Sequence, residues 1–386
     1  MIYLDNSATT EISLSSKEKM IEAMDAYGNP SSTHKAGIEA HRLLDEAREK
    51  VGVALGVGRV CAENLIFTAS GSEANNTAIL GSVYAKEKRR ANKVVTTDSE
   101  HPSIENVMKK LEKDGFEVVR ISTKSGKINE EQFLSAIDEK TLLISMMLVN
   151  NETGAVYDLK RLFSTAKRKV PDVITHCDAV QGFMKVPFTP KALSADLVSI
   201  SAHKIHGPKG VGALYVSPEI IKAKKMVPLI IGGGQENGYR SGTENIIGIA
   251  GFGAAAKESR ENFASNAQKI VSLRDYCEKA VLRAGARPNI PEGARAPHVL
   301  SVTLPNIKSE TMLNFLSGEG ICISAGSACS AHSKKMSSTL LSFGLTPHEA
   351  DCTVRVSFSE YNTEGDVDAF CRVLQEGINS LVRINH

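Results

Sequence analysis

Between Leu65 and Val216, apolar runs of strand length alternate with segments whose apolar residues recur at helical spacing. The runs are apolar throughout, which is typical of strands buried on both faces of a sheet. This alternation predicts an α/β fold whose mostly parallel sheet is flanked by helices. The runs predict a seven-stranded sheet: Leu65–Thr68, Val94–Thr97, Phe116–Ile121, Leu142–Val149, Val173–Asp178, Leu197–Ile200 and Gly212–Val216.

A different pattern begins after Gly251, where a helical region continues to about Ala284 and a connector rich in Gly, Pro and Arg follows. Short strands are then predicted at His298–Thr303, Ile321–Ser324 and Val354–Phe358, before a last amphipathic helix. A chain of 386 residues also exceeds one ordinary core. We therefore predict a large domain of residues 13–255 and a smaller α+β C-terminal domain of residues 256–386, which residues 1–12 join.

The composition is that of a soluble globular protein, with 42% hydrophobic and 23% charged residues. The net charge of +2 gives no electrostatic reason to expect direct binding of nucleic acid or of a membrane surface. No apolar run approaches the roughly 20 residues that a bilayer span needs. The seven cysteines are scattered without a C-x-x-C pair, which argues against a zinc or redox site. With no secretion signal at the N-terminus, we expect reduced thiols and a cytoplasmic protein.

Lys204 follows the predicted strand Leu197–Ile200, where a charge is costly to keep. A desolvated amine loses its proton more readily, and it can then form a Schiff base with a carbonyl compound. A surface lysine at a loop tip is the alternative. The neighbouring Ser201 and His203, with the glycines that follow, are suited to an anion and favour the first interpretation.

Asp178 ends another buried run, and no Arg or Lys close by in the sequence offers it a counter-ion. A carboxylate at that depth needs a cation or several hydrogen-bond donors, which leaves room for the protonated nitrogen of a ligand. Aspartate is the expected partner of the ring nitrogen of pyridoxal phosphate (PLP) beside a Schiff-base lysine. Lys204 and Asp178 together therefore favour a PLP site.

Further polar clusters end other strands of this sheet, and each has a structural alternative. Gly71 and Ser72 open a helix, whose N-terminus favours a phosphate unless a serine simply caps it. His101 could stack on a flat ring, shuttle a proton or cap its loop. Asn151 needs partners, which either a polar ligand or a self-satisfied turn supplies. Ligands of such sheets bind beyond the carboxyl ends of the strands, where all these clusters lie.

The C-terminal part of the chain adds three candidate features. Cys329 lies among small residues in a loop that looks accessible, as a thiolate nucleophile requires. Arg355 alternates with Val354 and Val356, so it leaves the apolar face of its strand and could bind a carboxylate; a surface arginine is the alternative. The glycine-rich loop 232–243 offers donors to an anion, in this chain's own site or in that of a second copy.

Nine ordered motifs make the chain resemble a cysteine desulfurase of the NifS/IscS-like group, in the class-V aminotransferase branch of fold-type I PLP enzymes. The resemblance spans essentially the whole chain. The motifs are LDNSATT, GNPSSTH, SGSEANN, SEHPS, NNETGAV, CDAVQ, SAHKIHGPKGVGALYV, GGGQENGYRSGT and SAGSACS.

The resemblance implies a role for each candidate residue. Around the cofactor ring, Lys204 carries PLP, His101 stacks on the ring, Asp178 pairs with its nitrogen, and Gln181 and Asn151 support its substituents. The residues that hold the phosphate are Gly71, Ser72, Ser201 and His203, together with Thr243 from the other subunit of a homodimer. The residues that act on the substrate are Arg355 and Asn151, which bind it, and Cys329, which is the nucleophile.

The implied reaction converts L-cysteine to L-alanine, with Lys204 or His101 moving protons and the sulfur left as a persulfide on Cys329. A sulfur-acceptor protein, either an iron–sulfur scaffold or a tRNA-thiolation enzyme, would then take the sulfur. Two departures from the family pattern stand out. Glu11 replaces a frequent proline, and the chain lacks the longer C-terminal tail with which housekeeping members dock the scaffold, which puts the scaffold partner in doubt.

The rival interpretations fall into three classes, the first of which leaves the preference between sulfur and selenium open. A selenocysteine lyase shares the same residues, whereas a true aminotransferase has no use for the thiol of Cys329. A nucleotide-binding module is disfavoured because no G-x-x-x-x-G-K-[ST] motif occurs and GPKGVG runs into a strand. A catalytically inactive sulfur relay would not need Lys204, Asp178, His101 and Cys329 together.

Overall fold

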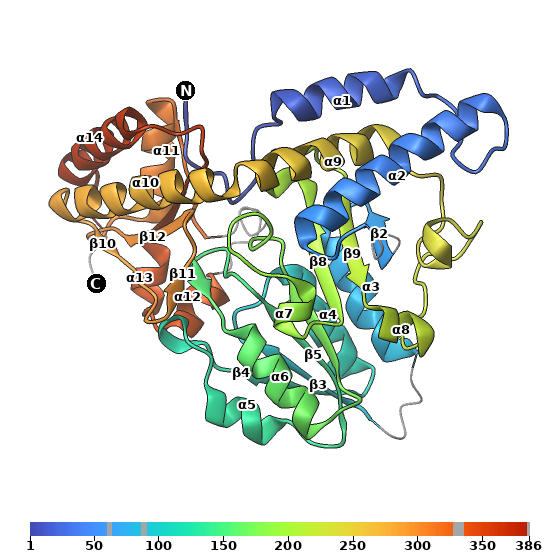
Figure 1. The fold of residues 1–386 in the computed structure, drawn as a ribbon. Helices are drawn as coiled ribbons and strands as arrows, with labels where there is room; N and C mark the ends of the chain where they lie inside the picture. Colours follow the sequence, from blue (N-terminus) through green and yellow to red (C-terminus); the bar gives the residue numbers. More distant parts are fainter. Residues whose placement is uncertain (60–63, 86–90, 327–335, 384–386) are drawn as a thin grey trace.

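The computed structural model describes residues 1–59, 64–85, 91–326 and 336–383. Within them, a seven-stranded sheet forms the centre of the larger domain (Figure 1). β9 runs antiparallel to both its neighbours, and the other strands are mutually parallel. The strand order is β2 (Leu65–Thr68), β9 (Gly212–Val216), β8 (Leu197–Ser201), β7 (Ile174–Asp178), β5 (Thr141–Met147), β3 (Lys93–Thr97) and β4 (Glu117–Ile121). The predicted sheet is thus confirmed, with strand ends that differ by no more than two residues.

Neighbouring strand residues point to opposite sides of the sheet, and here both are apolar. Helices therefore cover both faces. Ile66 packs in one core with α3 (Gly71–Tyr84) and α4 (Pro102–Lys113). Phe67, the next residue, packs in the other core with α2 (Lys35–Leu55), α6 (Leu159–Lys169) and α9 (Ile246–Glu261). The remaining helices of this part are α1 (Leu14–Met24), α5 (Glu130–Ala136), α7 (Pro190–Leu193) and α8 (Pro218–Lys222).

A second core lies apart from the large sheet, in the orange and red part of Figure 1 beside the N-terminus. Its three-stranded sheet has the order β10 (Arg287–Pro288), β12 (Val299–Thr303), β14 (Thr353–Ser357), and its main helices are α10 (Phe263–Arg283), α11 (Ser309–Gly318) and α14 (Glu364–Ser380). β1 (Ile2–Tyr3) pairs with β13 (Ile321–Cys322), and Leu4 belongs to this core. Two short helices, α12 (Ser338–Phe343) and α13 (Pro347–Asp351), complete the region.

The helical region after Gly251 is two helices rather than one, because Asn262 separates α9 from α10. The predicted domain boundary at 255/256 falls inside α9, whose Ala256 still packs in the large-domain core, while the second core begins at Ile270. The connector also contains β11 (Ala294–Arg295), which pairs with β6 (Ala155–Val156) of the large domain. No helix among the described residues has the length and apolar character to cross a membrane.

Candidate active site

A cavity of about 150 Å³ lies at the carboxyl ends of the central strands, where the sequence predicts a ligand. Arg355 reaches it from the smaller domain. Of the twelve predicted site residues, those that line the cavity are Gly71, Ser72, His101, Asn151, Asp178, Gln181, Ser201, His203, Lys204 and Arg355.

Lys204 ends the short 3-10 turn that follows β8, with its amine directed at the N-terminal segment. Its Nζ donates to the carbonyl oxygen of Ser7 at 2.5 Å and to that of Ala8 at 2.8 Å. Two main-chain acceptors compensate a partly buried amine for the water that it has lost. This contact was not predictable from the sequence, because the two partners lie almost 200 residues away along the chain.

Asp178 is the last residue of β7 and is 5% exposed. Its Oδ2 accepts from Asn75 Nδ2 at 2.8 Å, and its Oδ1 accepts from the backbone N–H of Val180 at 2.9 Å. Asn75 comes from α3 and was missed in the sequence, although it lies in the SGSEANN motif. These neutral donors hold the carboxylate in place without cancelling its charge, so a protonated ring nitrogen remains a suitable partner.

His101 is both the N-cap of α4 and a wall of the cavity, so the two alternatives for this residue are compatible. Its Nδ1 accepts from the backbone N–H of Ser103 at 3.1 Å, which leaves Nε2 to carry the proton of a neutral ring. Burial lowers the pKa of His101, the charge of Asp178 opposes this, and Lys204 lowers the pKa further. A neutral imidazole is the form that can either accept or donate a proton near pH 7.

The N-terminus of α3 forms one end of the cavity. Ser70 caps this helix, and Gly71 and Ser72 are its first residues. A Cβ atom on Gly71 would lie 2.7 Å from Val180 Cγ2, so glycine allows a close approach of the backbone here. Ser201 Oγ is buried without a hydrogen-bond partner among the described residues. A helix N-terminus beside an unpartnered hydroxyl group fits the phosphate of PLP.

His203 lies beside this end of the cavity, with its Nδ1 3.1 Å from Thr9 Oγ1. Burial lowers the pKa of His203 to about 4, and the charges of Lys204 and Lys209 add to the effect. The ring is therefore neutral near pH 7. It can serve a phosphate group through a hydrogen bond but not through a positive charge.

Gln181 is held by two partners that leave its side chain in one orientation. Its Nε2 donates to the Ser7 carbonyl oxygen at 2.9 Å, and its Oε1 lies 3.1 Å from His298 Nε2. Burial lowers the pKa of His298 well below its usual value, so the neutral ring donates from Nε2. His298 belongs to the second domain and was not singled out from the sequence.

Arg355 is 2% exposed and spans the two domains. Its Nη2 lies 2.8 Å from Asp5 Oδ1, and its Nη1 donates to the Asn151 carbonyl oxygen at 3.0 Å. Nε is buried without a partner among the described residues. The alternative of a surface arginine is therefore wrong, and the guanidinium is oriented by Asp5, which the sequence did not reveal as its partner.

Two predicted site residues do not line this cavity. Thr243 lines a separate cavity of about 210 Å³ together with Phe67, Glu236 and Arg240. Its predicted contact with the other subunit stays a prediction, because a single chain is described. Cys329 lies outside the described residues.

The site therefore combines a lysine after a buried strand, a carboxylate with neutral donors, a neutral histidine and a phosphate-type helix end. These are the residues that PLP needs for covalent attachment, ring protonation, stacking and phosphate binding. The fold and the site define a PLP-dependent enzyme.

Comparison with known proteins agrees with this class. The model of the aminotransferase class-V family matches residues 2–370. A cysteine desulfurase from Nostoc sp. is 35% identical over 385 residues, which cover 99% of this chain and 94% of that protein. A solved NifS-like protein superimposes with a TM-score of 0.91 at 36% identity, covering 98% of this chain and all of that one. A structure described as SspA in complex with cysteine gives a TM-score of 0.80 at 33% identity, covering 94% of this chain and 100% of that one. The chain belongs to the class-V aminotransferase family, within its cysteine desulfurases.

Proposed function

We propose that the chain is a PLP-dependent cysteine desulfurase that converts L-cysteine to L-alanine and holds the sulfur as a persulfide on Cys329. The observation that carries the proposal is the convergence of Lys204, Asp178, His101 and Arg355 on one cavity. Full-length relatives named for this activity support it.

Each residue has a task that its surroundings suit. Bound PLP supplies an electron-withdrawing ring that stabilises the negative charge left when the Cα proton departs. Asp178 keeps the ring nitrogen protonated, and Arg355 binds the carboxylate of cysteine through charge-assisted hydrogen bonds. The amine of Lys204 would remove the Cα proton, and the neutral His101 would move a proton at the reacting sulfur or amine.

Sulfur transfer needs a second thiol. The Cys329 thiolate attacks the sulfur of cysteine, a sulfur–sulfur bond forms as the Cβ–S bond breaks, and Cβ gains a proton to give alanine. The balance is one cysteine and one protein thiol in, one alanine and one protein persulfide out, without an external oxidant or reductant.

Three further parts of the proposal concern partners and place. The chain acts as a homodimer in which Thr243 completes the phosphate site of the other subunit. A sulfur-acceptor protein, either an iron–sulfur scaffold or a tRNA-thiolation enzyme, receives the persulfide in the cytoplasm. The cysteines in the described part of the chain form no disulfide bond.

The test is Cys329→Ala. We expect the purified variant to keep the visible absorption band of PLP and to release no sulfide from L-cysteine in the presence of a thiol reductant. Borohydride reduction followed by peptide mapping should place the label on Lys204 in both proteins. Normal sulfide release by Cys329→Ala would contradict the nucleophile assignment, and label on another lysine would contradict the cofactor site.

A further inference from the structure

A second polar cluster lies behind the cavity, two residues beyond Lys204. His206 is 3% exposed and adopts a left-handed backbone conformation with φ of 65°. Its backbone N–H donates to Thr10 Oγ1 at 2.7 Å, and its carbonyl oxygen accepts from Ser13 N at 2.9 Å. The loop that carries Lys204 and His206, called the lysine loop below, is therefore hydrogen-bonded through its main chain to the N-terminal segment that contains Thr10 and Ser13.

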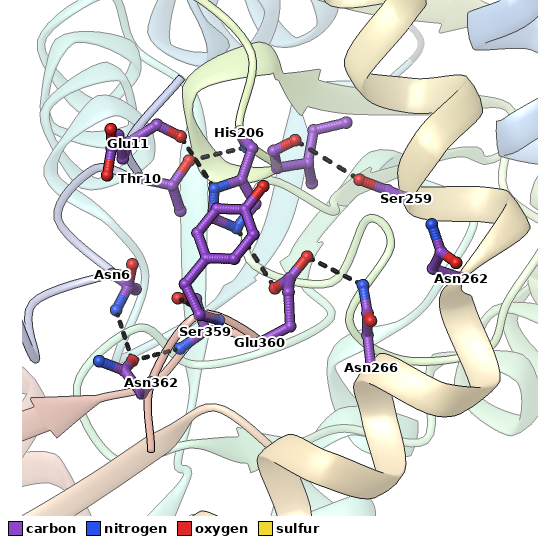
Figure 2. A network of polar contacts seen from close by, with 12 residues as sticks. Asn6, Thr10, Glu11, His206, Ser259, Asn262, Asn266, Ser359, Glu360 and Asn362 are labelled. Atoms are coloured by element: carbon purple, nitrogen blue, oxygen red, sulfur yellow. Dashed lines mark hydrogen bonds and ion pairs between the residues drawn. The ribbon is translucent and has the colours of Figure 1, made fainter. Parts of the chain in front are cut away.

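The imidazole of His206 faces two acceptors (Figure 2). Nδ1 is 2.8 Å from the Glu11 carbonyl oxygen, and Nε2 is 3.3 Å from Glu360 Oε2. A neutral ring carries one N–H and can satisfy only one of them, whereas the doubly protonated ring donates to both. The geometry therefore fits an imidazolium–carboxylate ion pair.

Glu360, in the loop after β14, is held in place from the second domain. Its Oε1 accepts from Asn266 Nδ2 at 2.9 Å, on the helix drawn at the right of Figure 2. Burial raises the pKa of Glu360, but the hydrogen bond from His206 and the charge of Lys185 lower it to about 2. The carboxylate is thus ionised over the whole working range of an enzyme.

Other titratable groups surround this pair, but none of them takes the place of His206 or Glu360 in the hydrogen bond between the two. The Tyr361 ring lies edge-on to His206 at 4.6 Å between centroids, and burial raises its pKa to about 12. Burial lowers the pKa of Lys185, and Glu360 opposes this. The carboxylates of Glu11 and Glu258 lie near the Tyr361 hydroxyl group and raise its pKa further.

The N-terminal segment that contacts His206 also holds the amine of Lys204. Lys204 Nζ donates to the carbonyl oxygens of Ser7 and Ala8. On its other side, the Asn6 side chain donates to Asn362 Oδ1 at 3.2 Å, in the same loop as Glu360. The lysine loop, the N-terminal segment and the second domain meet here, so a shift of any one changes the acceptors of Lys204.

We propose that His206 and Glu360 form a positioning pair, which fixes the N-terminal segment against the lysine loop and thereby orients the amine of Lys204. The pair acts through Lys204 and does not line the cavity among the described residues. The inference rests on the proposed role of Lys204 as the lysine that binds PLP. It adds a function for His206 and Glu360, which have none in the proposed reaction.

The experiment compares four variants of the PLP-loaded enzyme with a matched control. Glu360→Ala removes the partner of His206, and His206→Asn removes the imidazole with a residue that tolerates positive φ. Glu360→Gln keeps a side chain that can hydrogen-bond to either form of the ring. The double variant joins His206→Asn with Glu360→Ala, and Glu349→Ala is the control, since Glu349 is a carboxylate of the second domain that pairs with Arg287 instead.

The measurements are kcat and KM for L-cysteine, the pH midpoint at which the visible PLP band shifts, and the melting temperature. For Glu360→Ala and His206→Asn we expect kcat to fall about tenfold with KM nearly unchanged, because a misplaced reacting group mainly costs rate. The band midpoint should shift in both. The double variant should be no worse than the worse single variant, because the two residues act as one unit.

Glu360→Gln should recover most of the rate, and Glu349→Ala should leave the band midpoint unchanged. A lowered melting temperature without a change in the band or in kcat would show a structural role only and overturn the proposal, as would additive losses in the double variant. Borohydride labelling of the unsubstituted enzyme is the separate check. Label away from Lys204 would mean that the proposed function has failed, whatever the variants do.

Discussion

The two sides of the cavity are built in different ways. On the sheet side, formed by Gly71, Asp178, Ser201 and Lys204, each residue lies at the end of a strand or in the helix or 3-10 turn that follows a strand. On the closing side, Arg355 lines the cavity, and its partners Asp5 and Ser324, which do not line it, come from both ends of the chain. Asp5 Oδ1 binds Arg355, and its Oδ2 accepts from Ser324 Oγ at 2.7 Å. The backbone of the sheet side is thus positioned by one sheet, although the amine of Lys204 also contacts the N-terminal segment, and the closing side is positioned by contacts between distant segments.

This difference predicts different roles for the two sides of the cavity. A strand end fixes a side chain with little freedom, which suits groups that hold a cofactor throughout turnover. A side assembled across two domains can adjust when substrate enters, because such interfaces are the usual place of relative motion. Substitutions on the sheet side should therefore act on the chemical step, and those on the closing side on substrate binding.

Asp178→Asn is expected to have the largest effect. It keeps the size of the side chain but removes the negative charge opposite the ring nitrogen, and its single carbonyl oxygen can accept from only one of the two donors, Asn75 Nδ2 or the Val180 N–H. We expect kcat to fall by about 100-fold or more with KM changed far less, as when a preorganised charge is removed. Steady-state kinetics and the position of the PLP band measure this. A rise of KM without a loss of kcat would place Asp178 with the closing side and contradict the comparison.

Arg355→Gln should come second and act mainly on KM. Truncating a buried charge partner typically costs about 2–5 kcal/mol, so the KM for L-cysteine should rise at least about 30-fold. The PLP band of the substrate-free enzyme should remain.

Asp5→Asn is the matched control for Arg355→Gln, because it leaves the guanidinium in place and removes only the charge that orients it. We expect a smaller rise of KM, in the same direction. A larger effect than that of Arg355→Gln would mean that Asp5 has a task of its own in the site.

Glu100→Gln should have the smallest effect on catalysis and a clear one on stability. Burial raises the pKa of Glu100 to about 8, although hydrogen bonds from Thr97 and Met147 oppose this. Above pH 4.5 the unfolded chain releases a proton that the folded protein keeps, so this group lowers the free energy of unfolding as the pH rises towards 8.

The Glu100→Gln variant cannot ionise at this position and should lose this dependence. The melting temperature of the unsubstituted protein should fall between pH 5 and pH 8 by more than that of the variant, for a free-energy difference on the order of a few kcal/mol. Equal pH dependence in both proteins would show that Glu100 is already ionised in the folded state.

The same difference between the two sides explains which parts of the site could be predicted from the sequence. The seven strands and the residues that follow them were predictable, since apolar runs locate strands and parallel strands place their carboxyl ends at one edge. The partners of Arg355 and Lys204 were not, because Asp5 and Ser7 come from the other end of the chain and only packing brings them there. Asn75 was missed for another reason: it lies within a helix, where an amide gives no local sign of its partner.

The acceptors of Lys204 are main-chain oxygens, and this has a consequence for how the protein tolerates change. Every amino acid at positions 7 and 8 brings a carbonyl group, so exchange of those side chains leaves both acceptors present. The position of these two acceptors should be sensitive instead to substitution of residues that fix the path of the main chain. Ser357 is one of them, because its hydroxyl group accepts the Ser7 N–H at 2.9 Å.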